Sequence, residues 1–432
     1  MRFSVVCFSK PARTRLFWYQ LWKREGIYKE PLPQIPNHMR KQKEIPIIDP
    51  LKEEAVKEEW KPPVPDDLQF KQAPTVKEYP NYNENPAYIY IRSCRLTEGM
   101  KQACILTKSV QCEGFPQPIQ SLIGKIHIDN EEKLLQRCIM QSQVWDSTHV
   151  KLPKRGDLEN VGFKFTREYG IPRARRMDVF VQGLMRLCQL TSLQYPSVLT
   201  DRYIVSDSYL TSNYLFKEKR VSFEGKCKYL VLSDRPMLRF ADVDQVEESK
   251  EHELPDMYPI SPLISLQKRH DYTLQNIAGL EKDFTHSHPH TIFLMNTNFW
   301  TESQRQASAM MFAFGHAVAS AKNLYGEDVK VLPEPVCVQC VNASETTLNF
   351  TFFQLNTLDL SNSDGIKNFV WFDTSNHLFQ YQLRQPWKGP DYLSTIYHSF
   401  NPEGFHKLLA VFLANTPEAY DQNNDKIEAV SQ

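Results

Sequence analysis

Long apolar runs are missing from this sequence. The best apolar stretch, residues 307–321, includes His316 and falls short of the roughly 18 apolar residues that a membrane-spanning helix needs. We therefore expect no membrane span. Glycine is also scarce, at 15 of 432 residues, and there is no Gly-rich phosphate loop, nucleophile elbow, zinc-protease signature or kinase motif set. Nothing in the sequence marks a catalytic site or a small-molecule substrate.

A surplus of either charge is absent too. The chain has 51 Lys and Arg residues and 51 Asp and Glu residues, for a formal net charge of zero. Affinity for nucleic acid depends on many phosphate contacts, so any contact with RNA must be local. The nine cysteines are an odd number at irregular spacing, which fits a reducing compartment better than a disulfide framework. We therefore expect free thiols.

The N-terminus is basic. The first 24 residues contain six Lys and Arg residues and no Asp or Glu, interleaved with apolar side chains. This composition is typical of a mitochondrial presequence, which we predict over residues 1–25; the alternative is a basic arm that stays on the mature protein. Without these six residues, 45 basic residues remain against 51 acidic ones, so the rest of the chain has a net negative charge.

A proline-rich segment follows, over residues 26–86. It holds eleven prolines, each of which removes a backbone donor and favours extended geometry before it. We predict an extended arm without a core of its own, and a flexible linker is the alternative. Four aromatic residues of the arm are candidates for docking on a neighbouring protein. They are Trp60, Phe70, Tyr79 and Tyr82.

The remaining sequence predicts an α/β or α+β fold with a mixed sheet and packed helices. Residues 87–240 are helix-rich and then strand-rich, residues 257–415 mix strands and helices, and residues 416–432 form a polar tail. In the first part we expect a strand at 88–91, a helix capped by Thr97, a helix beginning after Asn130, a helix over 177–191 and antiparallel strands within 202–232.

An acidic run over 242–256 is expected to be a loop. The clearest helix lies at 301–325, where Thr301 and Gln304 form a capping box and a stripe of apolar residues predicts burial. Strands are expected over 291–295, 335–341, 347–355 and 367–373, and a last helix begins at Asn401 and Pro402.

Two groups could bind a metal. Cys337 and Cys340 have the spacing of a redox pair or half a zinc site, but no second pair accompanies them, and in a strand these positions point to opposite faces. Core packing is the favoured interpretation. His286, His288 and His290 would share one face of an extended strand, yet no cysteine lies close in sequence, so a solvated loop before the strand at 291–295 is favoured. His316 is interpreted as a core histidine.

The interval from residue 151 to residue 176, the basic interval below, combines cations with aromatic residues in a way that suits phosphate contact and base stacking. An ordinary solvated loop and helix start is the alternative. The candidate rRNA-contact residues are Lys151, Lys154, Arg155, Lys164, Arg167, Arg173, Arg175 and Arg176.

Several segments together resemble a known family. Residues 94–103 read CRLTEGMKQA and are followed by Leu106-Thr107-Lys108, residues 258–262 read YPISP, and residues 312–315 read FAFG ahead of Leu324-Tyr325-Gly326. With Pro289-His290-Thr291, Lys330-Val331-Leu332, residues 353–357 and Lys367-Asn368, this ordered set resembles the family numbered thirty-seven among the proteins of the mitochondrial ribosome's large subunit. The resemblance spans about residues 88–413; the arm and the basic interval match poorly.

The resemblance implies a structural constituent of that subunit in the mitochondrial matrix. It would have no catalytic residues, cofactor or metal, and would contact the large-subunit rRNA and other ribosomal proteins, among them the related protein numbered sixty-five. The rival hypothesis is a metal-dependent matrix enzyme that uses the histidines or the cysteine pair.

Overall fold

The computed structural model describes residues 20–21, 76–144, 150–152, 154, 160, 162, 164, 166–167, 169–279, 284–295, 300–383 and 396–420. The chain divides into two units, Met1–Ala73 and Pro74–Gln432, and the fold below belongs to the second. The predicted presequence and the arm up to residue 75, with Trp60 and Phe70, lie outside the described residues apart from Gln20 and Leu21.

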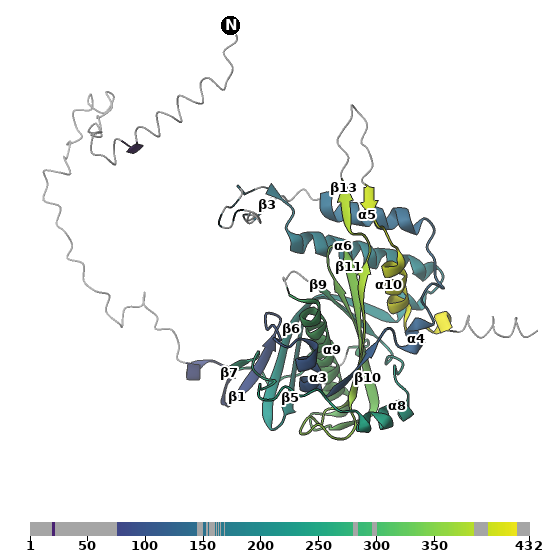
Figure 1. Cartoon of the computed structure of the whole chain (residues 1–432). Helices are drawn as coiled ribbons and strands as arrows, with labels where there is room; N and C mark the ends of the chain where they lie inside the picture. The colour runs from purple at the N-terminus through teal and green to yellow at the C-terminus, as the bar shows by residue number, and fades with distance from the viewer. Residues whose placement is uncertain are drawn as a thin grey trace, which may run out of the picture. The chain divides into compact units, whose positions relative to one another are not determined.

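A 10-stranded mixed sheet forms the centre of the second unit (Figure 1). Its main path runs β2 (Ser109–Glu113), β12 (Asn368–His377), β11 (Thr347–Thr357), β10 (Val331–Ala343), β9 (His288–Met295), β6 (Lys219–Ser233), β1 (Tyr82–Ile91) and β7 (Gln267–Asp271). Off this path, β5 (Arg202–Phe216) pairs with β6 and with β8 (Ile277–Ala278). The pairs β1–β6, β9–β10 and β2–β12 are parallel, and the other pairs along the sheet are antiparallel.

The helix α9 (Glu302–Tyr325) connects the parallel neighbours β9 and β10, because parallel strands cannot be joined by a tight turn. Its start is the predicted capping box: Thr301 Oγ1 accepts from the Gln304 amide at 3.3 Å, and Gln304 Oε1 accepts from the Thr301 amide at 3.2 Å. Gly315 lets the helix approach the sheet closely, since a Cβ there would lie 2.4 Å from Phe223 Cδ1. The predicted buried helix is confirmed.

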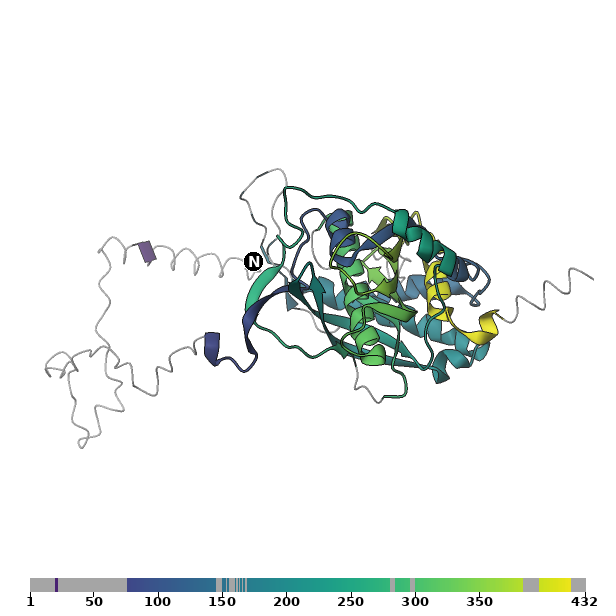
Figure 2. The ribbon, with the colours of Figure 1, turned by 90° about the horizontal axis from the view of Figure 1, so that it is seen from below.

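Helices cover both faces of the sheet. One core layer lies between the sheet and α9 together with α3 (Met100–Thr107). The other lies between the sheet and α4 (Gln117–Gln120), α5 (Glu131–Val144), α6 (Arg173–Gln189) and α10 (Glu403–Leu413). Figures 1 and 2 both show α10, in yellow, beside the blue α4, which is far from it in sequence. The α/β architecture with a mixed sheet and packed helices is confirmed.

Besides shifts of a few residues at the ends of β9 and β10, four elements differ from their predicted form. Gly99, with φ 55°, precedes α3 in place of Thr97, because the Thr97 hydroxyl bonds to Ser265 Oγ at 2.9 Å. The helix predicted over 177–191 begins earlier, at Arg173 after Pro172, whose fixed φ suits a helix start. The predicted loop over 242–256 contains α8 (Val243–Glu248) and a 3-10 turn (Ser249–Glu251), with Asp242 and Gln245 forming a capping box. The strand expected at 88–91 begins at Tyr82.

Short elements complete the described chain. They are η1 (Val76–Glu78), η2 (Leu190–Leu193), α7 (Ser197–Thr200), and the strand pairs β3 (Val150–Lys151) with β4 (Tyr169–Gly170) and β13 (Tyr381–Leu383) with β14 (Ile396–His398). In the ranges that the structure describes, every helix is too short or too polar to cross a lipid bilayer.

Candidate interaction surfaces

The basic interval divides into two parts. Lys151 in β3, Lys154, Lys164 and Arg167 are exposed, so their charges are available to a partner. Arg155 lies outside the described residues. The four exposed cations offer contacts to a negatively charged surface.

The other three candidates belong to α6 and have acidic partners in the chain. Arg176 lies 3.0 Å from Glu345 and Arg173 lies 3.9 Å from the same carboxylate. Arg175 lies 3.4 Å from Asp178, one turn along the helix. These pairs reduce the positive charge that the start of α6 presents. Sequence reasoning missed the Glu345 contact, because Glu345 is far away in the chain.

The two docking candidates that the structure describes occupy different settings. Tyr79 is 40% exposed in the segment before β1. Tyr82 begins β1, pairs with Asp271 of β7 and stacks on His270, with ring centroids 5.7 Å apart. Tyr82 therefore packs on its own domain, while Tyr79 is exposed. Contact of either tyrosine with a neighbouring protein stays a prediction.

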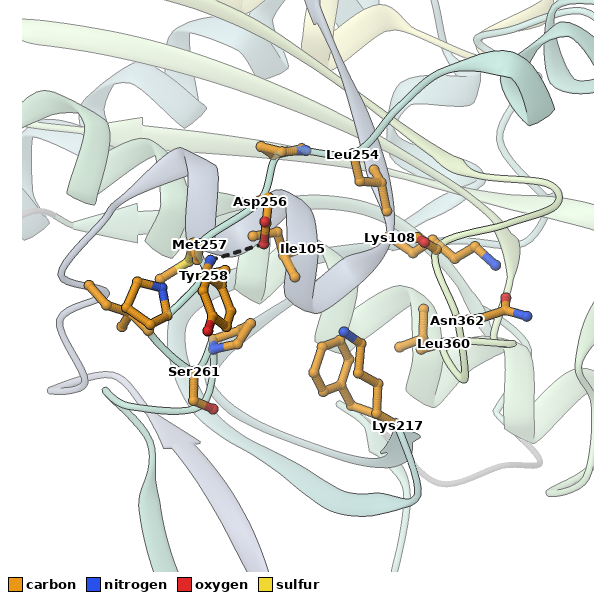
Figure 3. A pocket seen from close by; sticks show the side chains of 16 residues that line it. Ile105, Lys108, Lys217, Leu254, Asp256, Met257, Tyr258, Ser261, Leu360 and Asn362 are labelled. Carbon is orange, nitrogen blue, oxygen red and sulfur yellow. Dashed lines mark hydrogen bonds between the residues drawn. The ribbon is translucent and has the colours of Figure 1, made fainter.

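A pocket of about 440 Å³ lies where the segment 254–262 passes the end of α3 and the turn between β5 and β6 (Figure 3). The Tyr258 ring, 88% exposed, lines it together with Ile260. The Tyr258 amide donates to Asp256 Oδ1 at 2.9 Å, the dashed line in Figure 3. This bond and the neighbouring prolines shape the segment that presents the tyrosine ring to solvent.

Two lysines line the opposite side of this pocket (Figure 3). The Lys108 ammonium donates to the carbonyls of Asp359, at 3.1 Å, and Asp364, at 2.5 Å. These hydrogen bonds hold its charge within the protein. Lys217 is exposed, and its ammonium lies 5.7 Å from the Phe216 ring centre. Residues 254–256, the end of the acidic segment 242–256, also line the pocket. We call it the Tyr258 pocket.

The sequence contained two signals for this pocket. The motif YPISP and the acidic run before it were visible, but neither predicts which side chains stay exposed. That depends on α3, the β5–β6 turn and Leu360 closing around the segment from distant positions in the chain.

The two thiols of the Cys337–Cys340 pair face opposite layers of the core. Cys337 packs in the layer under α10 and Cys340 in the layer under α9. Burial raises the pKa of Cys337 to about 12 and that of Cys340 further, so both stay protonated. They cannot chelate one ion, as strand geometry predicts.

The three clustered histidines also separate. His290 is fully buried in β9, where Nε2 donates to the Ala414 carbonyl at 3.0 Å and Nδ1 accepts from Thr291 Oγ1 at 2.7 Å. His286 precedes the strand and contacts the Thr200 carbonyl at 3.4 Å. Because both nitrogens of His290 are used, this group does not form a three-histidine site. The favoured solvated loop holds for His286 but not for His288 and His290, because β9 begins at His288 and includes both.

Comparison with known proteins gives the family. No family model matches the chain. The large ribosomal subunit protein mL37 of Rattus norvegicus is 32% identical over 393 residues, which cover 86% of this chain and 87% of the rat protein. The mL37 proteins of Mus musculus and Gallus gallus are 33% and 30% identical over 80% and 79% of the chain. At this identity and coverage, the chain belongs to the mL37 family of large ribosomal subunit proteins.

Proposed function

We propose that this protein is a structural constituent of the large subunit of the mitochondrial ribosome and works in the mitochondrial matrix. The observation that carries the proposal is the match to mL37 proteins over about four fifths or more of both chains. The match covers most of the chain, so the relationship is not confined to one short segment. In this role the protein contacts rRNA and neighbouring ribosomal proteins and performs no chemistry.

The proposed rRNA contact uses the four exposed cations Lys151, Lys154, Lys164 and Arg167. Each can neutralise a phosphate and release a counterion. The nearby Arg173 and Arg176 share Glu345, so their part is to fix the start of α6. A contact of this size fits a chain with no net positive charge, because it needs only a local set of cations.

The proposed protein contact is the Tyr258 pocket. An exposed tyrosine beside a concave surface is the kind of group that anchors protein interfaces. Seven acidic residues lie within 242–256, and their charge disfavours phosphate and favours a basic segment of a neighbouring ribosomal protein. We propose that the partners of this protein include the related protein numbered sixty-five; the family resemblance supports this choice.

Sedimentation tests the function and the rRNA contact together. In a mitochondrial extract the protein should migrate with the large subunit at moderate salt. A variant with Lys151, Lys154, Lys164 and Arg167 changed to Ala should leave the subunit at lower salt, because several phosphate contacts are lost. The matched control changes the exposed Lys101, Lys226, Lys268 and Lys330 to Ala.

Two outcomes would count against these proposals. Recovery of the unmodified protein only at the top of the gradient would reject the ribosomal function. Equal salt dependence of the two fourfold variants would reject the rRNA contact and leave the function standing.

A photo-crosslinking residue in place of Tyr258 tests the protein contact. On assembled large subunits we expect a crosslink to a basic segment of one ribosomal protein, and the same probe at the exposed Tyr209 serves as the control. A crosslink to rRNA, or equal protein crosslinking from both positions, would contradict the assignment. Identification of the crosslinked protein tests whether it is the sixty-five protein.

A further inference from the structure

Three side chains from two segments meet where the start of α5 approaches α10. They are His127, in the turn before α5, Glu131, its first residue, and His406, on α10. His406 Nε2 donates to Glu131 Oε1 at 2.7 Å, and His127 Nδ1 lies 4.0 Å from the same oxygen. One ligand atom from each residue falls within 4.8 Å of the others. This is a two-histidine, one-carboxylate group on the α5–α10 side of the sheet.

The fold holds this group in place from both sides. Asn130, with φ 58°, and the bond from the Glu131 amide to the Ile128 carbonyl make the turn that brings Glu131 over His127, four residues earlier. On α10, Phe405 is fully buried on one side of His406. On the other, Lys407 donates to Asp373 at 3.0 Å and to Asn376 at 2.8 Å. The direction of His406 is therefore set by its neighbours.

Glu131 has an oxygen that the protein leaves unused. Its Oε2 is buried and accepts no hydrogen bond within the described part of the chain. Buried carboxylate oxygens almost always have a partner, so this atom indicates a ligand. The Glu131 and His406 side chains are 17% and 19% exposed, while His127 is 65% exposed, which leaves one open side for an ion and its water.

The spacing suits a small transition-metal ion. Zn²⁺ binds His nitrogen and carboxylate oxygen at about 2.0–2.2 Å in tetrahedral geometry, which separates ligand atoms by roughly 3.3 Å. The observed separations, 2.7 and 4.0 Å, lie on either side of that value. A rotation of the exposed His127 ring would close the set. Imidazole and carboxylate together favour Zn²⁺ over Mg²⁺ or Ca²⁺, which prefer oxygen ligands alone.

We infer that His127, Glu131 and His406 form a binding site for a Zn²⁺-class divalent cation that clamps the start of α5 to α10. The fourth position is left to water or to a group from a neighbour. This role is structural. Its test uses the isolated protein, so the result does not depend on the ribosomal function.

Metal titration of the purified full chain tests the site. After removal of metals with a chelator, we expect one equivalent of Zn²⁺ to bind, measured by calorimetry and by metal content after dialysis. The Tm should rise with Zn²⁺ concentration, and Co²⁺ should give a visible spectrum with nitrogen and oxygen ligands.

The variants H127A and E131Q should lose the bound equivalent and the Tm rise. The control H252A changes an exposed histidine outside the group and should keep both. His127 is mostly exposed, so H127A should keep the circular dichroism of the native fold even if E131Q does not. Absence of saturable Zn²⁺ binding, or equal binding by H127A and H252A, would overturn the inference.

Discussion

Two histidines of the core, His290 and His316, are fully buried. Burial lowers the pKa of His316 to about 4 and that of His290 well below its usual value. The neutral rings have hydrogen-bonding roles: His290 donates to Ala414 and His316 Nε2 donates to the Ala278 carbonyl at 3.2 Å. His316 is thus the core histidine that the sequence predicted, and His290 is a second one.

These pKa values predict a loss of stability in mild acid. Below pH 6.5 the unfolded chain binds protons on both histidines and the folded chain does not, so the free energy of unfolding falls as pH decreases from about 6.5 toward 4. Each histidine contributes a slope of up to about 1.4 kcal/mol per pH unit. Urea unfolding between pH 7.5 and 5.5 measures it.

The variant H316Q removes one of the two groups. Its free energy of unfolding should depend less steeply on pH, while H252Q, at an exposed position, should keep the slope of the unmodified protein. If H316Q and H252Q gave equal slopes, proton linkage through His316 would be wrong.

At the scale of elements, the acidic segment 242–256 shows how a predicted loop acquires structure. Asp242 and Gln245 cap α8. The buried Lys367, just before β12, fixes the 3-10 turn Ser249–Glu251 that follows α8. Its ammonium donates to the carbonyls of Ser249 at 2.8 Å, Lys250 at 3.1 Å and Gly365 at 3.3 Å. The pKa of Lys367 is lowered by burial.

The substitution K367M should release this segment. Three carbonyls lose a charged donor, and the one of Ser249 is buried, which should cost about 1–3 kcal/mol of stability. Residues 243–251 should then exchange amide hydrogens faster. Thermal or urea unfolding and hydrogen exchange followed by mass spectrometry measure the two effects. K250M is the control, since Lys250 is exposed and pairs with Glu247; similar exchange in both variants would show that Lys367 does not hold the segment.

At the scale of the whole molecule, the two predicted parts of the globular region interleave in one sheet. β2, from the first part, lies at the edge beyond β12, and β6, also from the first part, pairs with β9 of the second. Neither part can complete its own sheet. The prediction of two consecutive parts describes the order along the chain and not two separate structures.

This interleaving predicts a single unfolding transition. In increasing urea, peptides from β5–β6 and from β10–β11 should lose protection from hydrogen exchange at the same midpoint, because the strands share both core layers. Separate midpoints for the two sets of peptides would indicate that the halves fold independently. The β9–α9–β10 unit, which packs against both sets, should follow the common midpoint.

Local patterns in the sequence determined the elements with strong signals. The capping box at Thr301 and Gln304 predicted α9, Asn130 predicted the start of α5, and strand periodicity placed Cys337 and Cys340 on opposite faces. These features depend on residues within a few positions of one another, so a single sequence carries them. The ordered motifs over 88–413 likewise carried the family.

Tertiary structure decided what depends on distant residues. Glu345 forms ion pairs with two of the predicted RNA-contact arginines, Arg173 and Arg176. Thr97 bonds to Ser265 and does not cap α3. The Tyr258 pocket and the site of His127, Glu131 and His406 likewise join segments far apart in the chain. No local pattern predicts such contacts, because their energy comes from groups that only the completed sheet and its two helical layers bring together.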